Sequence, residues 1–180
     1  ASTSGGDIEL GNVGGDAVIK TAGGDIEVGQ VAGSATLKTA GGDIVLESAQ
    51  GRVAAGTAGG DLELRNISGS LKAKTAGGDI LAEMDPGTES GPSSLETAGG
   101  DIRLYLPAGV RARIEAVIEV RGNWERGIRK YGIYSDFPEV QIQKDASAGE
   151  IYAQADLNGG GEVITLSTVN GNIYIKHLAQ

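Results

Sequence analysis

Apolar and polar residues alternate in short runs along most of this chain, and each run ends at a turn residue. Residues 25–42 read DIEVGQVAGSATLKTAGG. Ile26 and Val28 flank a polar residue, a Gly-Ser turn signal follows, and Ala35 and Leu37 then alternate with polar residues. Alternation with a period of two is typical of strands, and glycine after each run is typical of turns. The segment therefore predicts two strands and two turns.

One phrase recurs along the chain with a fixed spacing. TAGGDI, or a close variant of it, begins at Thr3, Thr21, Thr39, Thr57, Thr75 and Thr97. The aspartates of these phrases are 18 residues apart, except for a last interval of 22. Such a unit is too short for a strand and a helix with their turns, but it fits one flattened coil. The sequence predicts an all-β, single-stranded β-solenoid of about 18-residue coils with two strands per coil. Its parallel strands would stack in register about 4.8 Å apart.

Stacking in register turns each position of the repeat into a column, so the interior can be predicted. Two inward columns carry mainly large aliphatic residues: Ile8, Ile26, Ile44, Leu62, Ile80 and Ile102 in one, and Leu10, Val28, Leu46, Leu64, Ala82 and Leu104 in the other. The columns that face them mix large and small residues: Ala17, Ala35, Val53 and Leu71 in one, and Ile19, Leu37, Ala55 and Ala73 in the other. Large residues opposite small ones suit a thin, close-packed interior.

A single domain is predicted over residues 1–180, in three parts. Residues 1–106 hold the regular repeats, and a four-residue insertion near 85–92 predicts a surface loop. Residues 107–148 hold longer strands that bracket an irregular excursion at 122–138. In residues 149–180, GEVITLSTVNGNIYI repeats the coil pattern, which predicts closing coils.

Composition excludes several classes of partner and chemistry. A formal net charge of −9 without a basic stripe argues against nucleic acid and against an anionic membrane surface as partners. No apolar run approaches the roughly 18 residues of a spanning helix, so no membrane insertion is expected. The absence of cysteine removes disulfides, thiol nucleophiles and zinc–cysteine sites.

Several motifs together resemble a known family. The TAGGDI repeats, YSDFP at 134–138, LNGGG at 157–161 and the closing STVNGNIYIK are similar to a bacterial adhesin-like family of β-strand-repeat proteins of unknown function. The resemblance covers nearly the whole chain and implies stacked β-coils. Members of that family are exported or surface-attached, so the resemblance implies an extracellular or cell-surface location, although this chain shows no signal peptide.

The aspartate column is the most chemical feature of the repeat. Its members are Asp7, Asp25, Asp43, Asp61, Asp79 and Asp101. Carboxylates about 4.8 Å apart repel by roughly 0.9 kcal/mol per pair even in water, so they need compensation. We interpret each aspartate as a cap that accepts backbone hydrogen bonds in the glycine turn. A calcium ladder is the alternative, but the chain lacks the calcium nonapeptide pattern and Asn172 breaks the column. Neither a metal nor a cofactor is expected.

The threonine column also has two interpretations. Its members are Thr21, Thr39, Thr57, Thr75, Thr97 and Thr168. Regularly spaced hydroxyls on an exposed sheet could order water, as in ice-binding solenoids, which carry paired threonine rows. Here the row is single and shares its alternation phase with the inward residues Ile19 and Leu37. A buried hydroxyl ladder at the corner of the coil is therefore favoured.

Charged residues form two outward columns. Glu9, Glu27 and Glu63 lie in one, which Val45, Leu81 and Arg103 interrupt, and Lys20, Lys38 and Lys74 lie in the other, which Gly56 and Glu96 interrupt. We interpret both columns as solvated faces that limit aggregation. The interruptions argue against a repeating charged substrate.

Enzymatic activity is not expected. His177 is the only histidine and lies near the C-terminus, so no Ser-His-Asp or histidine–metal set is predicted. The acids recur as columns rather than as the paired carboxylates of a glycosidase. A polysaccharide-active β-helix enzyme stays as an alternative.

The ends of the stack and the aromatic residues suggest two modes of association. Residues 2–7 already have repeat sequence and NIYIKHLAQ at 172–180 is β-prone, so both predict open strand edges. Head-to-tail stacking of copies into a fibre is one hypothesis. The other is a monomeric adhesin that binds a glycan or protein on a cell surface or matrix through Trp124, Tyr131, Tyr134 and Phe137. These aromatic residues could instead form a small core that shields one end.

Overall fold

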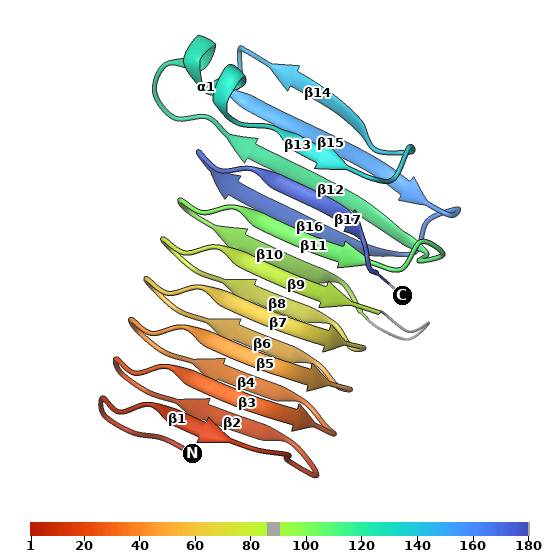
Figure 1. The fold of residues 1–180 in the computed structure, drawn as a ribbon. Coiled ribbons are helices and arrows are strands. Elements are labelled where there is room, and N and C mark those ends of the chain that lie inside the picture. The colour runs from red at the N-terminus through yellow and green to blue at the C-terminus, as the bar shows by residue number, and fades with distance from the viewer. Residues whose placement is uncertain (86–90, 180) are drawn as a thin grey trace.

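Strands stack along one axis in two facing sheets, as Figure 1 shows for the computed structural model, which describes residues 1–85 and 91–179. Sheet 1 contains, in spatial order, β1 (Ile8–Leu10), β3 (Ile26–Val31), β5 (Ile44–Ala49), β7 (Leu62–Ile67), β9 (Ile80–Met84), β11 (Ile102–Leu106), β17 (Ile173–His177) and β13 (Ile133–Ser135). Sheet 2 contains β2 (Ala17–Lys20), β4 (Ala35–Lys38), β6 (Val53–Gly56), β8 (Leu71–Lys74), β10 (Ser93–Thr97), β16 (Glu162–Val169), β12 (Ala112–Glu119), β15 (Glu150–Leu157) and β14 (Gln141–Asp145).

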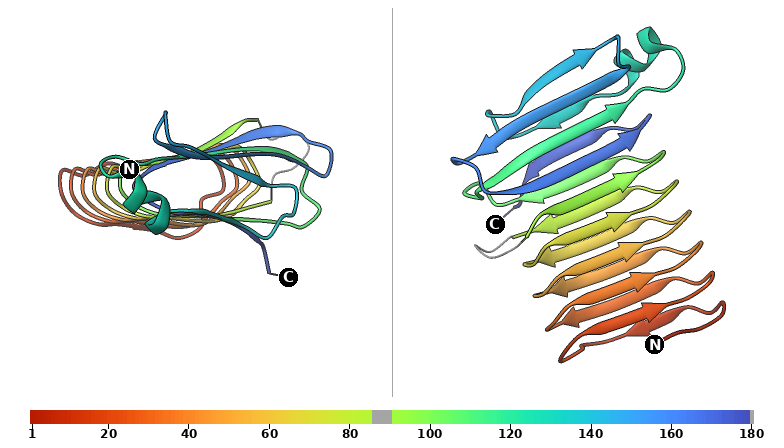
Figure 2. Two further views of the ribbon diagram at one scale, coloured as in Figure 1. Left: turned by 90° about the horizontal axis from the view of Figure 1, so that it is seen from above. Right: turned by 180° about the vertical axis from the view of Figure 1, so that it is seen from behind.

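The predicted β-solenoid of about 18-residue coils is confirmed. Ile26 pairs in register with Ile8 on one side and with Ile44 on the other, in parallel strands. Each early coil contributes one strand to each sheet, and Figure 2 shows the coils superposed as a flattened ring when viewed down the stack. The insertion in the fifth coil falls largely on residues 86–90, which lie outside the described residues.

The interior is a thin aliphatic layer between the sheets. The residues of the predicted inward columns are buried, except that Ile8 and Leu10 of the first coil are half-buried. These two lie in β1, which has a paired strand on one side only within residues 1–85 and 91–179. Strand burial alternates with a period of two, as in Ile44–Ala49, because successive side chains point to opposite sides of a sheet.

The closing coil lies inside the stack rather than at its end. After β11 the chain skips one level, builds β12, and returns later so that β16 pairs between β10 and β12. On the opposite sheet, β17 pairs between β11 and β13. The prediction that residues 172–180 form an open edge is therefore wrong for β17. The lengths of the strands explain why β16 lies beside β12. The strands β12, β15 and β16 each have eight residues, so β12 is paired along its full length on both sides only when it lies between the other two.

The region between β12 and β15 also differs from the prediction. The excursion at 122–138 contains the helix α1 (Trp124–Lys130) and β13. Asn123 caps the helix by accepting the N–H of Arg126, and acidic and basic residues lie in its first and last turns respectively. The segment after Gly149 begins with β15, an antiparallel partner of β12, so the coil pattern returns only at β16.

The far end of the stack is closed differently from the coils. There, β13 and β14 are the edge strands of sheets 1 and 2, and Figure 1 places α1 beside them. The ammonium group of Lys144 in β14 donates to the carbonyl oxygen of Ile128 in α1 at 3.4 Å. The described residues contain no helix with the length and apolar character that a membrane crossing requires.

Candidate functional site

A threonine hydroxyl joins each TAGGD turn to the preceding coil. Thr75 is only 2% exposed. Its Oγ1 donates to the carbonyl oxygen of Gly60 at 2.9 Å and accepts the N–H of Gly78 at 3.3 Å. The same two bonds recur at Thr39 and Thr57. The predicted buried hydroxyl ladder is confirmed, so this column offers no regular solvent-facing hydroxyls.

The second glycine of each turn allows successive coils to touch through their backbones. A Cβ at Gly60 would lie 2.1 Å from the carbonyl oxygen of Gly42, whereas a Cβ at Gly59 would have no atom nearer than 3.9 Å. Neither glycine has a positive φ. Glycine is required at the second position because of this close approach and not because of the dihedral angles of the turn.

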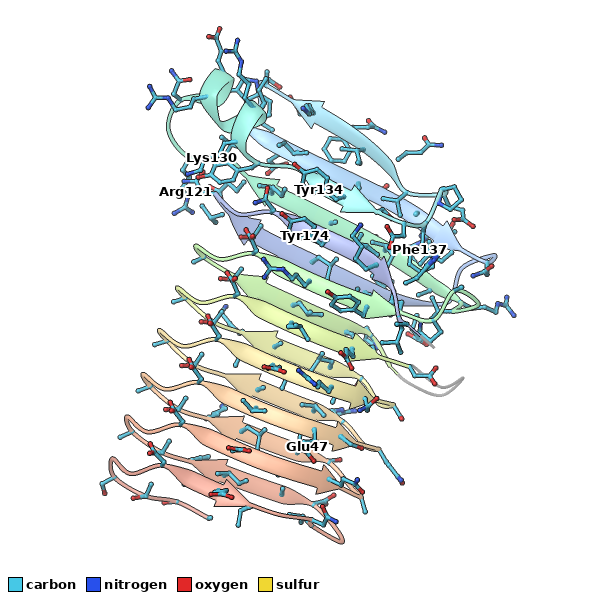
Figure 3. The ribbon with its side chains drawn as sticks, in the orientation of Figure 1. Glu47, Arg121, Lys130, Tyr134, Phe137 and Tyr174 are labelled. Carbon is cyan, nitrogen blue, oxygen red and sulfur yellow. The ribbon has the colours of Figure 1, made fainter. Side chains whose placement is uncertain are left out.

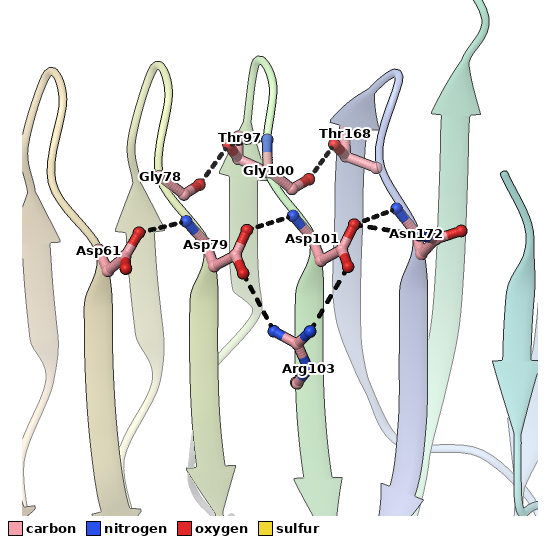
Figure 4. A network of polar contacts seen from close by, with 9 residues as sticks. All are labelled: Asp61, Gly78, Asp79, Thr97, Gly100, Asp101, Arg103, Thr168 and Asn172. Carbon is pink, nitrogen blue, oxygen red and sulfur yellow. Dashed lines mark hydrogen bonds and ion pairs between the residues drawn. The ribbon is translucent and has the colours of Figure 1, made fainter. Parts of the chain in front are cut away.

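The aspartates form a continuous column of hydrogen bonds, and Figure 4 shows its part from Asp61 to Asn172. Oδ1 of Asp61 accepts the N–H of Asp79 at 2.7 Å, and Oδ1 of Asp79 accepts the N–H of Asp101 at 2.8 Å. The earlier aspartates Asp7, Asp25 and Asp43 make the same contact. Oδ1 of Asp101 continues the column by accepting the N–H of Asn172.

The partner of each aspartate differs from the predicted one. We expected a bond within the same turn, but the N–H of the second glycine, such as Gly78, already binds the threonine. The carboxylate binds the backbone of the next coil instead and so links coils along the stack. Within residues 1–85 and 91–179, no group of three or more His, Cys, Asp or Glu residues is arranged to hold a metal ion.

Arg103 connects this column to the outer side of sheet 1. Its Nη1 lies 3.2 Å from Oδ2 of Asp79 and its Nη2 lies 3.5 Å from Oδ2 of Asp101. Burial alone would lower the pKa of Arg103, but the hydrogen bond and charge of Asp79, with the charges of Asp101 and Tyr174, raise it overall. The two ion pairs therefore hold the guanidinium beside the aspartate column.

Two tyrosines continue the column of Arg103 towards the far end. Register places Arg103 beside Tyr174, and Tyr174 beside Tyr134. The guanidinium carbon lies 5.4 Å from the ring centroid of Tyr174, and the two tyrosine rings stack with centroids 5.1 Å apart and planes 16° apart. Figure 3 shows the tyrosines on neighbouring strands β17 and β13. We call Arg103, Tyr174 and Tyr134 the tyrosine platform.

The four aromatic residues predicted as a binding site do not share one surface. Tyr134 is 49% exposed. Trp124 and Tyr131 are half-buried and pack against the core from α1 and its C-cap. Phe137 is buried, and its ring meets the ring of His177 edge to face at 4.4 Å. Phe137 as a binding residue is therefore wrong, because its side chain fills the interior beside β17.

Tyr174 is the platform residue that sequence reasoning missed. It lies in the closing NIYIK motif, and its outward direction follows from alternation with Ile173 and Ile175. Its position beside Tyr134 depends on the insertion of β17 next to β13, which no local pattern indicates.

Exposed ion pairs fasten the strands around the platform end. Asp136 accepts from the ammonium group of Lys176 at 2.8 Å and from the N–H of His177 at 3.2 Å, and both bonds lower the pKa of Asp136. On sheet 2, Arg113 donates two hydrogen bonds to Asp156, at 2.7 and 3.0 Å, which lower the pKa of that carboxyl. These contacts join β17 to the segment after β13, and β12 to β15.

The sequence profile of the Toastrack DUF4097 family matches residues 1–120, two thirds of the chain. The chain belongs to this family. Toastrack proteins are β-repeat proteins of unknown function, so membership supports the fold and assigns no activity. No curated protein and no solved structure matches the chain.

The Toastrack match ends just after β12. It includes Arg103 but not Tyr134 or Tyr174. The platform therefore combines one residue of the Toastrack repeats with two residues of the segment that completes the far end.

Proposed function

We propose that the protein is a non-enzymatic structural and adhesive module of the bacterial cell surface, which binds a glycan or protein through the tyrosine platform. The observation that carries this proposal is the stacked pair Tyr134 and Tyr174 beside the fixed charge of Arg103. Tyrosine supplies a large contact area with few rotatable bonds, and arginine adds directed hydrogen-bond donors. Such groups dominate many binding interfaces.

The solenoid supports this role as a rigid scaffold. Each coil is tied to the next by backbone pairing in both sheets and by the threonine and aspartate columns. Side chains that are already held in place lose less entropy when they bind a partner. The proposed extracellular location follows from the resemblance to exported β-strand-repeat proteins.

Capture on immobilised ligands tests the adhesive role. We expect the protein to bind at least one member of a panel of neutral and acidic polysaccharides and matrix proteins. Tyr134→Ala should weaken that binding by about tenfold or more, as loss of a central aromatic contact does. Tyr152→Ala is the matched control, because it removes a half-buried tyrosine from sheet 2. Absence of any capture, or capture that survives both Tyr134→Ala and Tyr174→Ala, would refute the proposal.

The proposed lack of catalysis is tested on the same panel. His177 contacts Phe137 edge to face, and the carboxylates of the aspartate column are engaged in backbone bonds. We expect no release of new reducing ends from any polysaccharide. Release above the level of heat-denatured protein would instead support the alternative of a polysaccharide-active enzyme.

End-to-end fibre formation is a second proposal, carried by β14. Among the described residues this edge strand pairs only with β15, and residues 141–144 are exposed. Fibres built through this edge would hold strands perpendicular to their axis and give a meridional reflection near 4.8 Å. Concentrated samples that show no filaments by electron microscopy would refute end-to-end assembly.

A further inference from the structure

The two outer faces of the early coils carry opposite charges in the same pattern. The outward column of sheet 2 reads Lys20, Lys38, Gly56, Lys74 in register, and that of sheet 1 reads Glu9, Glu27, Val45, Glu63. Both columns flank the same row of TAGG turns. The interruption falls in the third coil on both faces, so each lysine shares its coil with a glutamate and Gly56 shares its coil with Val45.

A hollow on the outer side of sheet 2 surrounds Gly56. The hollow has a volume of about 690 Å³ and is lined by Ala54 and Ala58, with Lys38, Lys72 and Lys74 around it. A Cβ at Gly56 would lie no nearer than 3.6 Å to any atom, so the backbone itself leaves this space open. The hollow therefore offers a small apolar floor with a basic rim.

Several of these charges have no counter-ion within the molecule. In the part of the chain that the structure describes, no ion pair involves Lys20, Lys38, Glu9 or Glu27. At the fourth level, Glu63 pairs with Arg65 and Lys74 pairs with Glu96. The charges of the first two coils are thus available to a partner.

We propose that the lysine face of one molecule docks on the glutamate face of a second copy, with Val45 of one molecule seated in the Gly56 hollow of the other. Both columns belong to the same coils, so they share one repeat distance. A copy docked with equivalent coils facing each other therefore meets a complementary charge at the first, second and fourth coils. Complementary charges favour association and fix its register.

The same arrangement gives compatible neighbours at the later levels. Glu96 falls opposite Leu81, Ser167 opposite Arg103, Val117 opposite Tyr174, and Tyr152 opposite Tyr134. In the adjacent column of each face Lys72 falls opposite Arg65, and Glu47 and Glu83 belong to the coils before and after that arginine. The lysine and glutamate columns therefore attract each other, while Lys72 and Arg65 repel. Two glutamates near that arginine offset this repulsion.

The contact is heterologous, so it does not close on itself. Each molecule keeps one free lysine face and one free glutamate face, and copies can add without limit in a direction perpendicular to the solenoid axis. In such a stack only the last molecule leaves its tyrosine platform uncovered. This inference goes beyond the proposed function, because it uses the acidic half of sheet 1 and not the tyrosine platform. Self-association is also measured without any polysaccharide.

Sedimentation velocity across protein concentration tests the contact. We expect the mean mass of the wild type to rise with concentration at low salt and to return to that of the monomer at high salt, because exposed charge pairs are screened. Lys38→Glu and Glu27→Lys should each weaken association on the order of tenfold. The double variant Lys38→Glu, Glu27→Lys should restore it, since the two reversed charges face each other between copies.

Two further variants separate this contact from a general effect of charge. Glu125→Lys changes the net charge as Glu27→Lys does but lies on α1, and it should associate like the wild type. Gly56→Lys meets no backbone clash, and it should abolish association by filling the hollow. Thermal melting confirms that each variant is folded. A wild type that stays monomeric at all concentrations, single reversals without effect, or a double variant that stays monomeric would each overturn the proposal.

Discussion

Single residues of the TAGGD phrase act between coils rather than within one. The hydroxyl of Thr75 donates to the previous coil, the carboxylate of Asp61 accepts from the next, and Gly60 leaves room for the backbone of Gly42. Each role needs an equivalent residue one coil away. This mutual dependence is the physical reason why the phrase recurs with little change.

The two glycines of one turn should differ strongly in how far their substitution destabilises the fold. Gly60→Ala forces a Cβ against a backbone carbonyl that cannot rotate away, so we expect a loss of about 1–3 kcal/mol or more in the free energy of unfolding. Gly59→Ala adds a methyl group in open space and should change that free energy by less than about 0.5 kcal/mol. Urea denaturation of both variants gives the comparison. Equal losses would show that the coils do not approach as described.

At the scale of elements, the insertion of β16 and β17 decides how the stack ends. Long strands with similar alternation could pair in several orders. The order observed gives β17 a paired strand on each side, β11 on one and β13 on the other. It leaves two short strands, β13 and β14, as the edges at this end. The C-terminal strand is consequently one of the protected elements.

Hydrogen exchange should reveal this order of strands. The amides of β17 have partners on both sides, so we expect them to exchange as slowly as those of β5 in the regular coils. Alternate amides of β14 face none of the strands that the structure describes, and they should exchange much faster. Mass spectrometry of peptides that cover residues 141–145 and 173–177 measures the contrast. Equal exchange in the two peptides would contradict the insertion of β17.

The link between β17 and the segment after β13 should depend on pH. The pKa of Asp136 is lowered by Lys176 and by the backbone of His177, so the ionised carboxylate stabilises the folded state. That contribution is complete above the ordinary pKa of 3.8 and is lost as the pH falls through the lowered value. Asp136→Asn should therefore melt at a lower temperature than the wild type near neutral pH, and the difference should shrink in strong acid.

Melting curves over this range of pH, with Glu125→Gln as a control, test the effect of Asp136. Glu125 is exposed and makes no ion pair among the described residues. Its substitution should leave the difference from the wild type small at every pH. A constant difference for Asp136→Asn from neutral pH to strong acid would show that the carboxylate does not act through its charge.

For the whole molecule, the position of a coil in the stack should determine how much its buried side chains contribute to the free energy of unfolding. Leu46 has paired strands on both sides and is fully buried, whereas Leu10 lies in the edge strand β1 and is half-buried. We expect Leu46→Ala to cost about 2–5 kcal/mol and Leu10→Ala clearly less. Denaturant unfolding of both variants measures the ratio, and equal costs would contradict a stack with an exposed first level.

The regular half of the molecule could be read from its sequence because its contacts join equivalent positions one period apart. Alternation identified the inward columns, and the shared phase of threonine with Ile19 and Leu37 identified the buried hydroxyls. The aspartate partner could not be predicted in the same way. Alternation does not show which backbone N–H groups the threonine and the aspartate bind, and in the structure the threonine binds that of the second glycine and the aspartate that of the next coil.

The sequence by itself determined the coil, its period and the side of each strand that faces the interior, because these follow from local alternation repeated at a constant interval. Only the tertiary structure decided where the last coil lies and which residues meet on the platform. Tyr134 and Tyr174 are 40 residues apart, and their contact depends on which of several similar strand edges β17 joins. That choice is a competition between distant pairings, and no short segment of the chain contains it.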